Sequence, residues 1–258
     1  MTRLATWNVN SLKVRQERVE AWITEVQPDI VCLQETKLSD SAFPAMSFAA
    51  LGYDSAHYGE GRWNGVGILS RVGLDDIVAD FADGGDPDTD ARLLSATCAG
   101  IRISSVYVPN GRDPEHDHYQ YKLRWLDRLA AHLVATTEIS DPVVVAGDFN
   151  IAPGDDDVYD VTKFEGATHV SQPERDRLSA LIHWGLRDIG REQVGTGSVF
   201  SWWDYRRGDF HEGRGMRIDL VLGTPSVADR VEWAIIDRNA RKGKLPSDHA
   251  PVIIDLTD

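Results

Sequence analysis

Cysteine is scarce in this sequence, and long apolar runs are absent from it. The chain has 258 residues and 2 cysteines, Cys32 and Cys98, which is too few for the disulfide framework of a small secreted domain. Both lie in strand-like apolar runs, so we expect two buried thiols. No run approaches the roughly 18 apolar residues of a membrane-spanning helix, and the N-terminal residues lack the apolar stretch of a signal peptide. These absences predict a cytoplasmic protein that does not bind a membrane.

Positive charge is also in short supply. Lysine and arginine total 27 against 41 aspartates and glutamates, which gives a formal net charge of −14 at pH 7. A general nucleic-acid-binding protein normally presents a basic face, so this balance disfavours that class unless the acidic residues lie elsewhere. Acidic residues are concentrated at 83–90 and 155–157. We expect both segments to be loops, and the first of them to be solvated. A nucleic-acid-binding surface would therefore be a local basic rim on an acidic body.

The chain is predicted to fold as one α/β domain. Its hydrophobic content of 42% is sufficient for a sizeable core, and it contains no repeat, coiled coil, low-complexity segment or linker, which predicts a single domain over residues 1–258. The first part of the chain predicts a strand at 3–9, a helix at 14–26 and a strand at 29–35, a compact layered unit. We expect further strands at 66–70, 101–108, 142–147, 217–222 and 252–256, and further helices at 119–134 and 174–186.

The stretch from Pro142 to Asn150 is central to the functional prediction. Pro142 opens a run of β-branched apolar residues that is too short for a helix and is typical of a buried strand. The run ends in Gly147 and continues to Asp148 and, two residues later, Asn150. Because positions i and i+2 of an extended backbone share a face, a carboxylate and a carboxamide can project into one pocket and hold a water or a phosphoryl oxygen. Taken alone, the stretch favours a polar turn that closes a strand.

Polar side chains end or interrupt other predicted strands as well. Asp219 stands in an apolar strand, where a carboxylate has to be paired to be tolerated; a neighbouring arginine would be one such partner. The Ser-Asp-His segment at 247–249 is, by itself, a common turn. The complete set is Asn8, Glu35, Tyr107, Asp148, Asn150, Asp219, Asp248 and His249. Separate structural explanations for all of them are less economical than one shared site.

The donor types in this set predict a hard cation. Oxygen ligands without a cysteine or multi-histidine set suit Mg²⁺, with Mn²⁺ as the alternative, rather than zinc. A hard cation beside a histidine and several acids suits phosphodiester hydrolysis, because charge builds on the non-bridging and leaving oxygens during that reaction.

Seven motifs resemble those of the exodeoxyribonuclease III family of DNA-repair nucleases, within the endonuclease/exonuclease/phosphatase superfamily. They lie, in the family's order, at 6–10 (TWNVN), 33–37 (LQETK), 107–111 (YVPNG), 147–150 (GDFN), 200–206 (FSWWDYR), 217–219 (RID) and 247–251 (SDHAP). The resemblance implies a deoxyribonuclease I-like, four-layered α/β sandwich, in which helices flank two packed mixed sheets and the active site lies at one edge. It also implies 3′→5′ exonuclease, 3′-phosphatase and apurinic/apyrimidinic (AP) endonuclease activities on double-stranded DNA. We expect a monomer whose substrates are duplexes with abasic sites or with blocked or recessed 3′ ends.

The resemblance also implies roles for the residues that handle the metal and the attacking water. Glu35 would be the principal Mg²⁺ ligand, with Asn8 nearby and Asp248 as a further ligand. Asp148 would orient or deprotonate the attacking water, and Asn150 would steady that water or the developing phosphorane. Both Asp148 and Asn150 would also lie within reach of the metal.

The remaining catalytic roles concern the phosphate. His249 would contact the scissile phosphate, and Asp219 would fix its tautomer and favour the imidazolium. Tyr107 would donate to a phosphate oxygen or to the leaving group. Whether Asp148 or His249 is the general base stays open at this point.

Ten further residues are predicted to contact DNA. They are Lys37, Arg62, Arg92, Asn110, Lys122, Trp202, Trp203, Arg206, Met216 and Ile218. Among them, the family resemblance places Trp203, Met216 and Ile218 around a pocket for an extruded, base-less sugar, which an apolar slot can select by size. The loop that carries Arg62 is equally consistent with an ordinary surface hairpin.

Other members of the superfamily differ from this chain at identifiable positions. Deoxyribonuclease I-like enzymes carry a second catalytic histidine where this chain has Tyr107. Inositol phosphatases and sphingomyelinases lack the aromatic segment at 200–206 in this form. A non-catalytic adaptor would be expected to have lost one of the key polar residues, and this chain retains them all. The sequence therefore favours a DNA-repair nuclease and leaves open the balance among its three activities.

Overall fold

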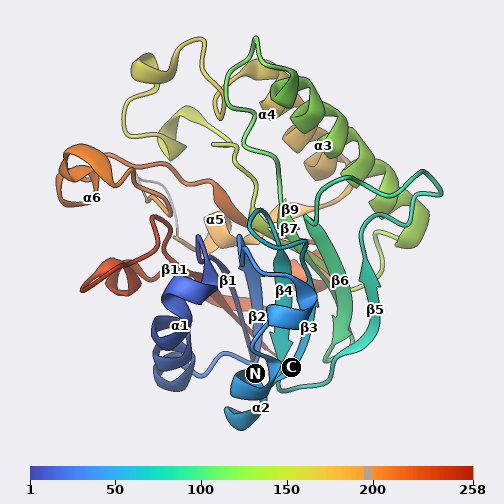
Figure 1. The fold of residues 1–258 in the computed structure, drawn as a ribbon. Helices are drawn as coiled ribbons and strands as arrows, with labels where there is room; N and C mark the ends of the chain where they lie inside the picture. Colours follow the sequence, from blue (N-terminus) through green and yellow to red (C-terminus); the bar gives the residue numbers. More distant parts are fainter. Residues whose placement is uncertain (195–198, 258) are drawn as a thin grey trace.

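The computed structural model describes residues 1–194 and 199–257. Within them the strands form two six-stranded sheets, ordered β11-β12-β1-β2-β4-β3 and β5-β6-β7-β8-β10-β9 (Figure 1). The strands are β1 (Thr2–Asn8), β2 (Ile30–Gln34), β3 (Asp54–Tyr58), β4 (Val66–Ser70), β5 (Asp75–Ala79), β6 (Leu93–Cys98), β7 (Ile101–Tyr107), β8 (Val143–Asp148), β9 (Arg187–Asp188), β10 (Asp219–Gly223), β11 (Val231–Ile236) and β12 (Val252–Leu256). Both sheets are mixed, since β1 pairs in parallel with β2, and β7 with β8, while other neighbours are antiparallel.

The α-helices of the described residues are α1 (Leu12–Val26), α2 (Ala45–Ala50), α3 (Asp117–Thr136), α4 (Gln172–Trp184), α5 (Ile189–Val194), α6 (Asp209–Glu212) and α7 (Pro225–Ala228). The longer helices α1, α3 and α4 cover the outer faces of the two sheets. One apolar cluster joins α1 to the outer face of β1 and β2, and another joins α3 and α4 to the outer face of β8 and β10. A third cluster fills the space between the sheets. This arrangement confirms the predicted four-layered α/β sandwich.

Strand β8 shows why its sequence is continuously apolar. It lies inside its sheet, between β7 and β10. Val144 and Ala146 face the core between the sheets, whereas Val143 and Val145 face α3 and α4. A strand buried on both faces needs apolar residues at every position rather than at alternate ones. The β-branched side chains also suit the extended backbone.

Most predicted elements are present, with shifts at their ends. The helices predicted at 119–134 and 174–186 are α3 and α4, and the strands predicted at 66–70 and 252–256 are β4 and β12. The cysteines are buried, as predicted. Among the described residues, no helix is long and apolar enough to cross a membrane.

The prediction of a loop at 155–157 is wrong in part. The segment 155–157 forms a short 3-10 helix rather than a loop, and Asp157 is buried. Its carboxylate accepts a 2.7 Å hydrogen bond from Nε of Arg217, whose guanidinium also pairs with Asp188 at 2.8 Å. Burial is tolerated because the charge is paired.

The strand pairing brings the predicted site residues to one edge. Tyr107 is aligned with Asp148 across β7 and β8, and Asp148 is aligned with Asp219 across β8 and β10. In the other sheet, Asn8 ends β1 and is aligned with Gln34, the last residue of β2. Because the two sheets stack with these strand ends together, residues from both reach a common site.

Candidate active site

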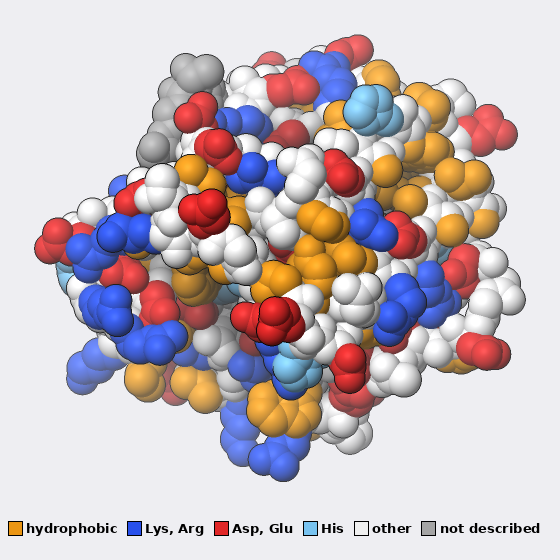
Figure 2. All heavy atoms as spheres, turned by 90° about the horizontal axis from the view of Figure 1, so that it is seen from above, with side chains coloured by type: hydrophobic (Ala, Val, Ile, Leu, Met, Phe, Trp, Pro, Cys, Tyr) orange, Lys and Arg blue, Asp and Glu red, His pale blue; other side chains and the backbone are white. Residues whose placement is uncertain are grey.

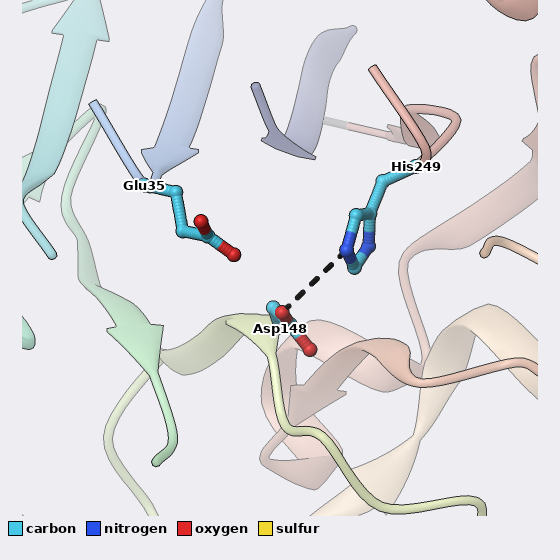
Figure 3. Close-up of side chains that lie close together, drawn as sticks. All are labelled: Glu35, Asp148 and His249. Carbon is cyan, nitrogen blue, oxygen red and sulfur yellow. Dashed lines mark ion pairs between the residues drawn. The ribbon is translucent and has the colours of Figure 1, made fainter. Parts of the chain in front are cut away.

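Three ionisable side chains converge at this edge. Glu35 follows β2, Asp148 ends β8, and His249 precedes β12, and their side chains point toward one another (Figure 3). Each offers one ligand atom such that all three atoms lie within 4.8 Å of one another. Nε2 of His249 lies 3.8 Å from Oδ2 of Asp148. Together with Asn8 and Asp219, these residues are called the active-site cluster below.

Two of the site residues have an unusual backbone conformation. Glu35 and Asn150 both adopt left-handed backbone conformations, with φ of 50° and 51°. Non-glycine residues rarely adopt this conformation, and it is often found at functional sites. Gly147 is required for a different reason: a Cβ there would lie 1.9 Å from the carbonyl oxygen of Val106. The glycine therefore permits β7 and β8 to approach closely just before Asp148.

Asp148 lies at the centre of the hydrogen-bond network. Its Oδ2 accepts from Nδ2 of Asn8 at 2.9 Å and from Nδ2 of Asn150 at 3.2 Å, and its Oδ1 accepts from the backbone N–H of Asn150 at 2.9 Å. Burial raises the pKa of Asp148 to about 7; the neighbouring Asp219 and Glu35 add to the rise, and His249 opposes it. A carboxylate with this pKa can accept a proton near neutral pH.

His249 is held by Asp219. Its Nδ1 donates to Oδ2 of Asp219 at 2.8 Å, the pairing that the sequence predicted. Burial alone would lower the pKa of His249, but Asp219 and Asp148 outweigh it and raise the pKa to about 10. The ring is therefore an imidazolium at neutral pH and has no free lone pair. With Nδ1 engaged by Asp219, Nε2 is the ring nitrogen that faces Asp148.

The oxygen atoms that remain suit a hard cation. Oε1 of Glu35 accepts from Nδ2 of Asn8 at 2.8 Å, and Oε2 lies 2.9 Å from Nζ of Lys37. Glu35 and Asp148 thus place two carboxylates around the same amide group. Two adjacent carboxylates of this kind match the oxygen donors that Mg²⁺ uses. Asn8 accepts the backbone N–H of Asn10 with its Oδ1, at 2.9 Å, so its oxygen is already engaged.

Asp248 lies beside the active-site cluster. Its Oδ1 accepts from Nδ2 of Asn10 at 2.9 Å, and its Oδ2 accepts from the indole of Trp202 at 3.2 Å. Burial alone would raise the pKa of Asp248, but His249 and these hydrogen bonds outweigh it and lower the pKa. It is not part of the three-residue group described above. Its predicted role as a further metal ligand stays a prediction.

Tyr107 is set up as a donor. Burial, with a contribution from the charge of Glu35, raises the pKa of Tyr107 well above its usual value. The phenol therefore stays protonated. The guanidinium of Arg92 lies 4.7 Å from the centre of the Tyr107 ring and pairs with Asp90 at 2.9 Å. Arg92 is buried in this position, so it supports Tyr107 and has little surface to offer to DNA.

The structure corrects the prediction that Lys122 contacts DNA. Lys122 is completely buried on α3, and its ammonium is paired with Glu174 of α4. It therefore cannot reach a phosphate on the surface of the protein.

Three other predicted DNA contacts are also interior residues. Met216 and Ile218 pack against Ala152 and Val158. Trp203 packs edge-on against Phe210. They lie beneath the surface rather than on it. The remaining predicted contacts keep at least part of their side chains accessible: Lys37, Arg62, Asn110, Trp202 and Arg206.

Sequence reasoning missed His169. Its Nε2 lies 3.2 Å from Oδ1 of Asn150 and 3.1 Å from Nδ2 of Asn110, and Asn110 also donates to Asn150 at 3.0 Å. Burial and the neighbouring Lys122 lower the pKa of His169 to about 3, so the ring is neutral. No motif or periodicity marks this histidine. Asn10, by contrast, lies inside the motif at 6–10 and could have been selected.

Comparisons with known proteins agree with this geometry. Residues 5–249 match the Endonuclease/Exonuclease/phosphatase family. The chain is 30% identical over 262 residues to exodeoxyribonuclease III of Haemophilus influenzae, covering 97% of this chain and 98% of that protein. Its structure is similar to an AP endonuclease from Archaeoglobus fulgidus (TM-score 0.97, 33% identity) and to the 3′ phosphatase NExo from Neisseria, solved with a product DNA hairpin (TM-score 0.95, 34% identity). Both similarities cover 100% of each chain.

The chain therefore belongs to the endonuclease/exonuclease/phosphatase family, whose fold it shares throughout. Within this family it groups with the exodeoxyribonuclease III and AP endonuclease enzymes, which depend on a metal and hydrolyse phosphodiester bonds. The predicted function as a DNA-repair nuclease is confirmed at this level.

Proposed function

We propose that this protein is a Mg²⁺-dependent phosphodiesterase of the cytoplasm that acts on damaged double-stranded DNA. It would incise at abasic sites, and it would process recessed ends and ends blocked by a 3′-phosphate, as a monomer with a single domain over residues 1–258. The names of its relatives support this range, since they include an exodeoxyribonuclease, an AP endonuclease and a 3′ phosphatase. Mn²⁺ is the alternative ion, because it accepts the same oxygen donors.

The observation that carries the proposal is the position of Asp148 between two kinds of partner. On one side lie Asn8 and Glu35, and on the other lies the His249–Asp219 pair. The Asp148 carboxylate therefore stands beside a hydrogen-bond donor that Asp219 fixes in place. Hydrolysis of a phosphodiester needs this combination, because water must lose a proton while negative charge builds on the phosphate.

In the proposed mechanism, Asp148 orients the attacking water and accepts its proton. The amide of Asn150, fixed by hydrogen bonds to Asp148 and to the carbonyl of Val108 at 3.0 Å, steadies that water. His249 donates from Nε2 to a phosphate oxygen, and this role leaves Asp148 as the base, since an imidazolium cannot accept another proton.

Two further groups act on the phosphate. Tyr107 donates its phenolic proton to a phosphate oxygen or to the leaving oxygen. Glu35 and Asp148 would hold Mg²⁺, with Asn8 and Asp248 as neighbours that complete its surroundings. When bound, Mg²⁺ supplies positive charge that stabilises the developing negative charge on the phosphate.

The proposed DNA surface is a rim around this site. The face in Figure 2 carries separate groups of Lys and Arg side chains, with Asp and Glu between them, around an apolar central area. We propose that Lys37, Arg62 and Arg206 contact the DNA backbone and that Asn110 and Trp202 contact the strand near the scissile bond. Mg²⁺ would offset part of the negative charge of the active-site cluster itself.

One apolar group fits the pocket for a base-less sugar. Trp202 is half-buried and packs over Met216 and Ile218. Trp203, on the neighbouring side, is fully buried. Trp202 would therefore form the accessible wall of the pocket, and the three buried residues would set its shape.

A single purified preparation tests the proposal. Three matched duplexes, with an abasic site, a recessed 3′-OH end or a 3′-phosphate, are incubated with Mg²⁺, with Mn²⁺ or with EDTA. We expect cleavage of all three substrates with either metal and none with EDTA, and the ratio of the three rates ranks the activities. Asp148→Asn serves as the matched inactive control. Activity that persists in EDTA, or that is equal in the Asp148→Asn variant, would overturn the proposal.

A further inference from the structure

A buried ion pair lies behind the active-site cluster and takes no part in the mechanism above. Lys122 of α3 and Glu174 of α4 face each other with both side chains 0% exposed. Removing two charges from water is costly, and replacing such a pair with uncharged residues is often neutral for stability. A buried ion pair is therefore weak evidence of a stabilising role, and its other contacts have to be considered.

The ammonium of Lys122 reaches three loops at once. Besides Glu174, its Nζ donates to the backbone oxygen of Asn150 at 2.7 Å. It also lies 3.3 Å from the backbone oxygen of Asn110 and 3.3 Å from Oγ1 of Thr168. These loops follow β8, follow β7 and precede α4, respectively.

Glu174 holds the third loop from the other side. Its Oε1 accepts from Oγ1 of Thr168 at 2.7 Å and from the backbone N–H of His169 at 3.0 Å. Its Oε2 accepts from the backbone N–H of Ser171 at 3.1 Å, which closes the capping box at the start of α4. The pair therefore connects the backbones that carry Asn110, Asn150 and His169.

The side chains of those same three residues hydrogen-bond to one another, as described above. Asn150 is the one that touches the active-site cluster, through Asp148. Its backbone is in the left-handed region, which an asparagine adopts at some cost. The 2.7 Å hydrogen bond from Lys122 holds the carbonyl of this residue in place.

We propose that the Lys122–Glu174 pair positions the active site by fixing the peptide of Asn150, and with it the orientation of the Asn150 amide toward Asp148. Lys122 and Glu174 are positioning residues, since neither touches the substrate. The inference rests on the proposed function. It predicts an effect on turnover rather than on DNA binding, because the pair lies away from the surface.

The main test replaces both charges together, because a single replacement would leave the other charge buried and unpaired. In Lys122→Met/Glu174→Gln the single carboxamide oxygen of the glutamine keeps an acceptor for one of the two backbone N–H groups, that of Ser171 or that of His169. We expect kcat on the abasic duplex to fall about 10-fold or more, the scale on which misplaced catalytic groups act. KM should change less than about 3-fold, and circular dichroism at neutral pH should be unchanged, because replacing both charges leaves no unpaired buried charge.

The matched control is an ion pair far from the site. Arg3 and Asp255 pair at 2.7 Å between β1 and β12, at the opposite end of β1 from Asn8. Arg3→Met/Asp255→Asn should leave kcat unchanged. If the Lys122→Met/Glu174→Gln protein does not fold, Lys122→Leu/Glu174→Gln, which likewise removes the donor to Asn150, is measured in its place with the same expectation for kcat and KM.

A double-mutant cycle separates positioning through Asn150 from other effects. Asn150→Gly removes the amide while tolerating the positive φ. In that background, the Lys122→Met/Glu174→Gln change should lower kcat less than about 2-fold further, because the group that it positions is already absent. A full 10-fold further loss, a wild-type kcat in the original background, or a rise in KM alone would each overturn the inference. These outcomes are distinct from failure of the proposed function, in which the wild-type protein would cleave none of the three duplexes.

Discussion

The active-site cluster and the Lys122–Glu174 pair both place charged side chains in the interior, but they differ in charge balance. The cluster sets three carboxylates, those of Glu35, Asp148 and Asp219, around one imidazolium. Lys37 pairs with Glu35 only at the periphery. The Lys122–Glu174 pair matches one cation with one anion and surrounds both with backbone and hydroxyl partners.

The pKa shifts express this difference. In the cluster, burial raises the pKa of Asp148 to about 7; the neighbouring Asp219 and Glu35 add to the rise, and His249 opposes it. Burial alone would also raise the pKa of Glu174, but Lys122 and several hydrogen bonds outweigh it, and the pKa of Glu174 is lowered. The cluster thus has an excess of negative charge that a bound metal ion or a proton can balance. In the Lys122–Glu174 pair, one positive charge already balances one negative charge.

The largest effect is expected from removing the central carboxylate of the cluster. Asp148→Asn should lower turnover by roughly 10² or more, the scale of a lost acid–base group, and should leave affinity for abasic DNA within a few fold. Single-turnover cleavage in Mg²⁺ and binding in Ca²⁺ measure the two quantities. Affinity and rate that fall together would show that Asp148 only holds the DNA, and the contrast with the positioning pair would disappear.

The next largest effect concerns the His249–Asp219 pair. Asp219→Ala should reproduce most of the turnover loss of His249→Ala, because Asp219 holds the imidazolium in its orientation and charge state. The double variant should be far from additive. Rate constants for the two single variants and the double variant complete the cycle; additive losses would mean that the two residues act separately.

The Mg²⁺ dependence of the rate should distinguish the active-site cluster from the Lys122–Glu174 pair. Glu35→Gln should raise the Mg²⁺ concentration needed for the half-maximal rate and lower the maximal rate, because it removes a carboxylate ligand. Circular dichroism and the melting temperature should barely change. Lys122→Met/Glu174→Gln, by contrast, should leave the half-maximal Mg²⁺ concentration as in the wild type. An Mg²⁺ titration of the rate compares the three proteins, and an unaltered dependence in Glu35→Gln would refute the ligand assignment.

Acid stability should depend on the Lys122–Glu174 pair. The lowered pKa of Glu174 means that its contribution to stability is complete above the unfolded value of about 4.3 and is lost as the pH falls through the folded value. Urea unfolding midpoints measured from pH 7 to pH 3 should therefore fall in the wild type below about pH 4. The Lys122→Met/Glu174→Gln variant should give a flatter curve in that range. Parallel curves would show that Glu174 does not contribute.

The smallest expected effect is on the salt dependence of DNA affinity, which should respond to surface charge and not to buried charge. Log affinity for the abasic duplex in Ca²⁺ should fall with log salt at a slope near −3 to −5, for about three to five neutralised phosphates. Arg206, whose side chain is 84% exposed, should account for about one unit of this slope when replaced by alanine. Lys122→Met/Glu174→Gln should leave the slope unchanged. A flat dependence in the wild type would contradict the basic rim.

Several features were determined by the sequence alone. The continuous β-branched run of β8 predicts a strand covered on both faces, and the structure confirms this because core lies on either side of it. A carboxylate at Asp219 in an apolar strand requires a partner, and His249 is that partner. Local rules of this kind depend on the burial and chemistry of each residue, so they can be read without knowing the contacts. The motifs and their order identified the family because they, too, can be read along the chain without knowing the contacts.

Only the tertiary structure determines that Lys122 is a buried, paired charge and not a contact to DNA. Its spacing from Tyr119, Trp125 and Leu126 does place it on the buried face of α3, yet a lysine near functional motifs is also typical of a contact to DNA. The deciding factor is Glu174, which is 52 residues away and meets Lys122 because α3 packs against α4. Whether a charge is buried and paired depends on which distant element supplies the counter-charge, and that information resides in the packing of the elements rather than in either segment. His169 reaches Asn150 in the same way, through a loop whose path is set by the folded chain.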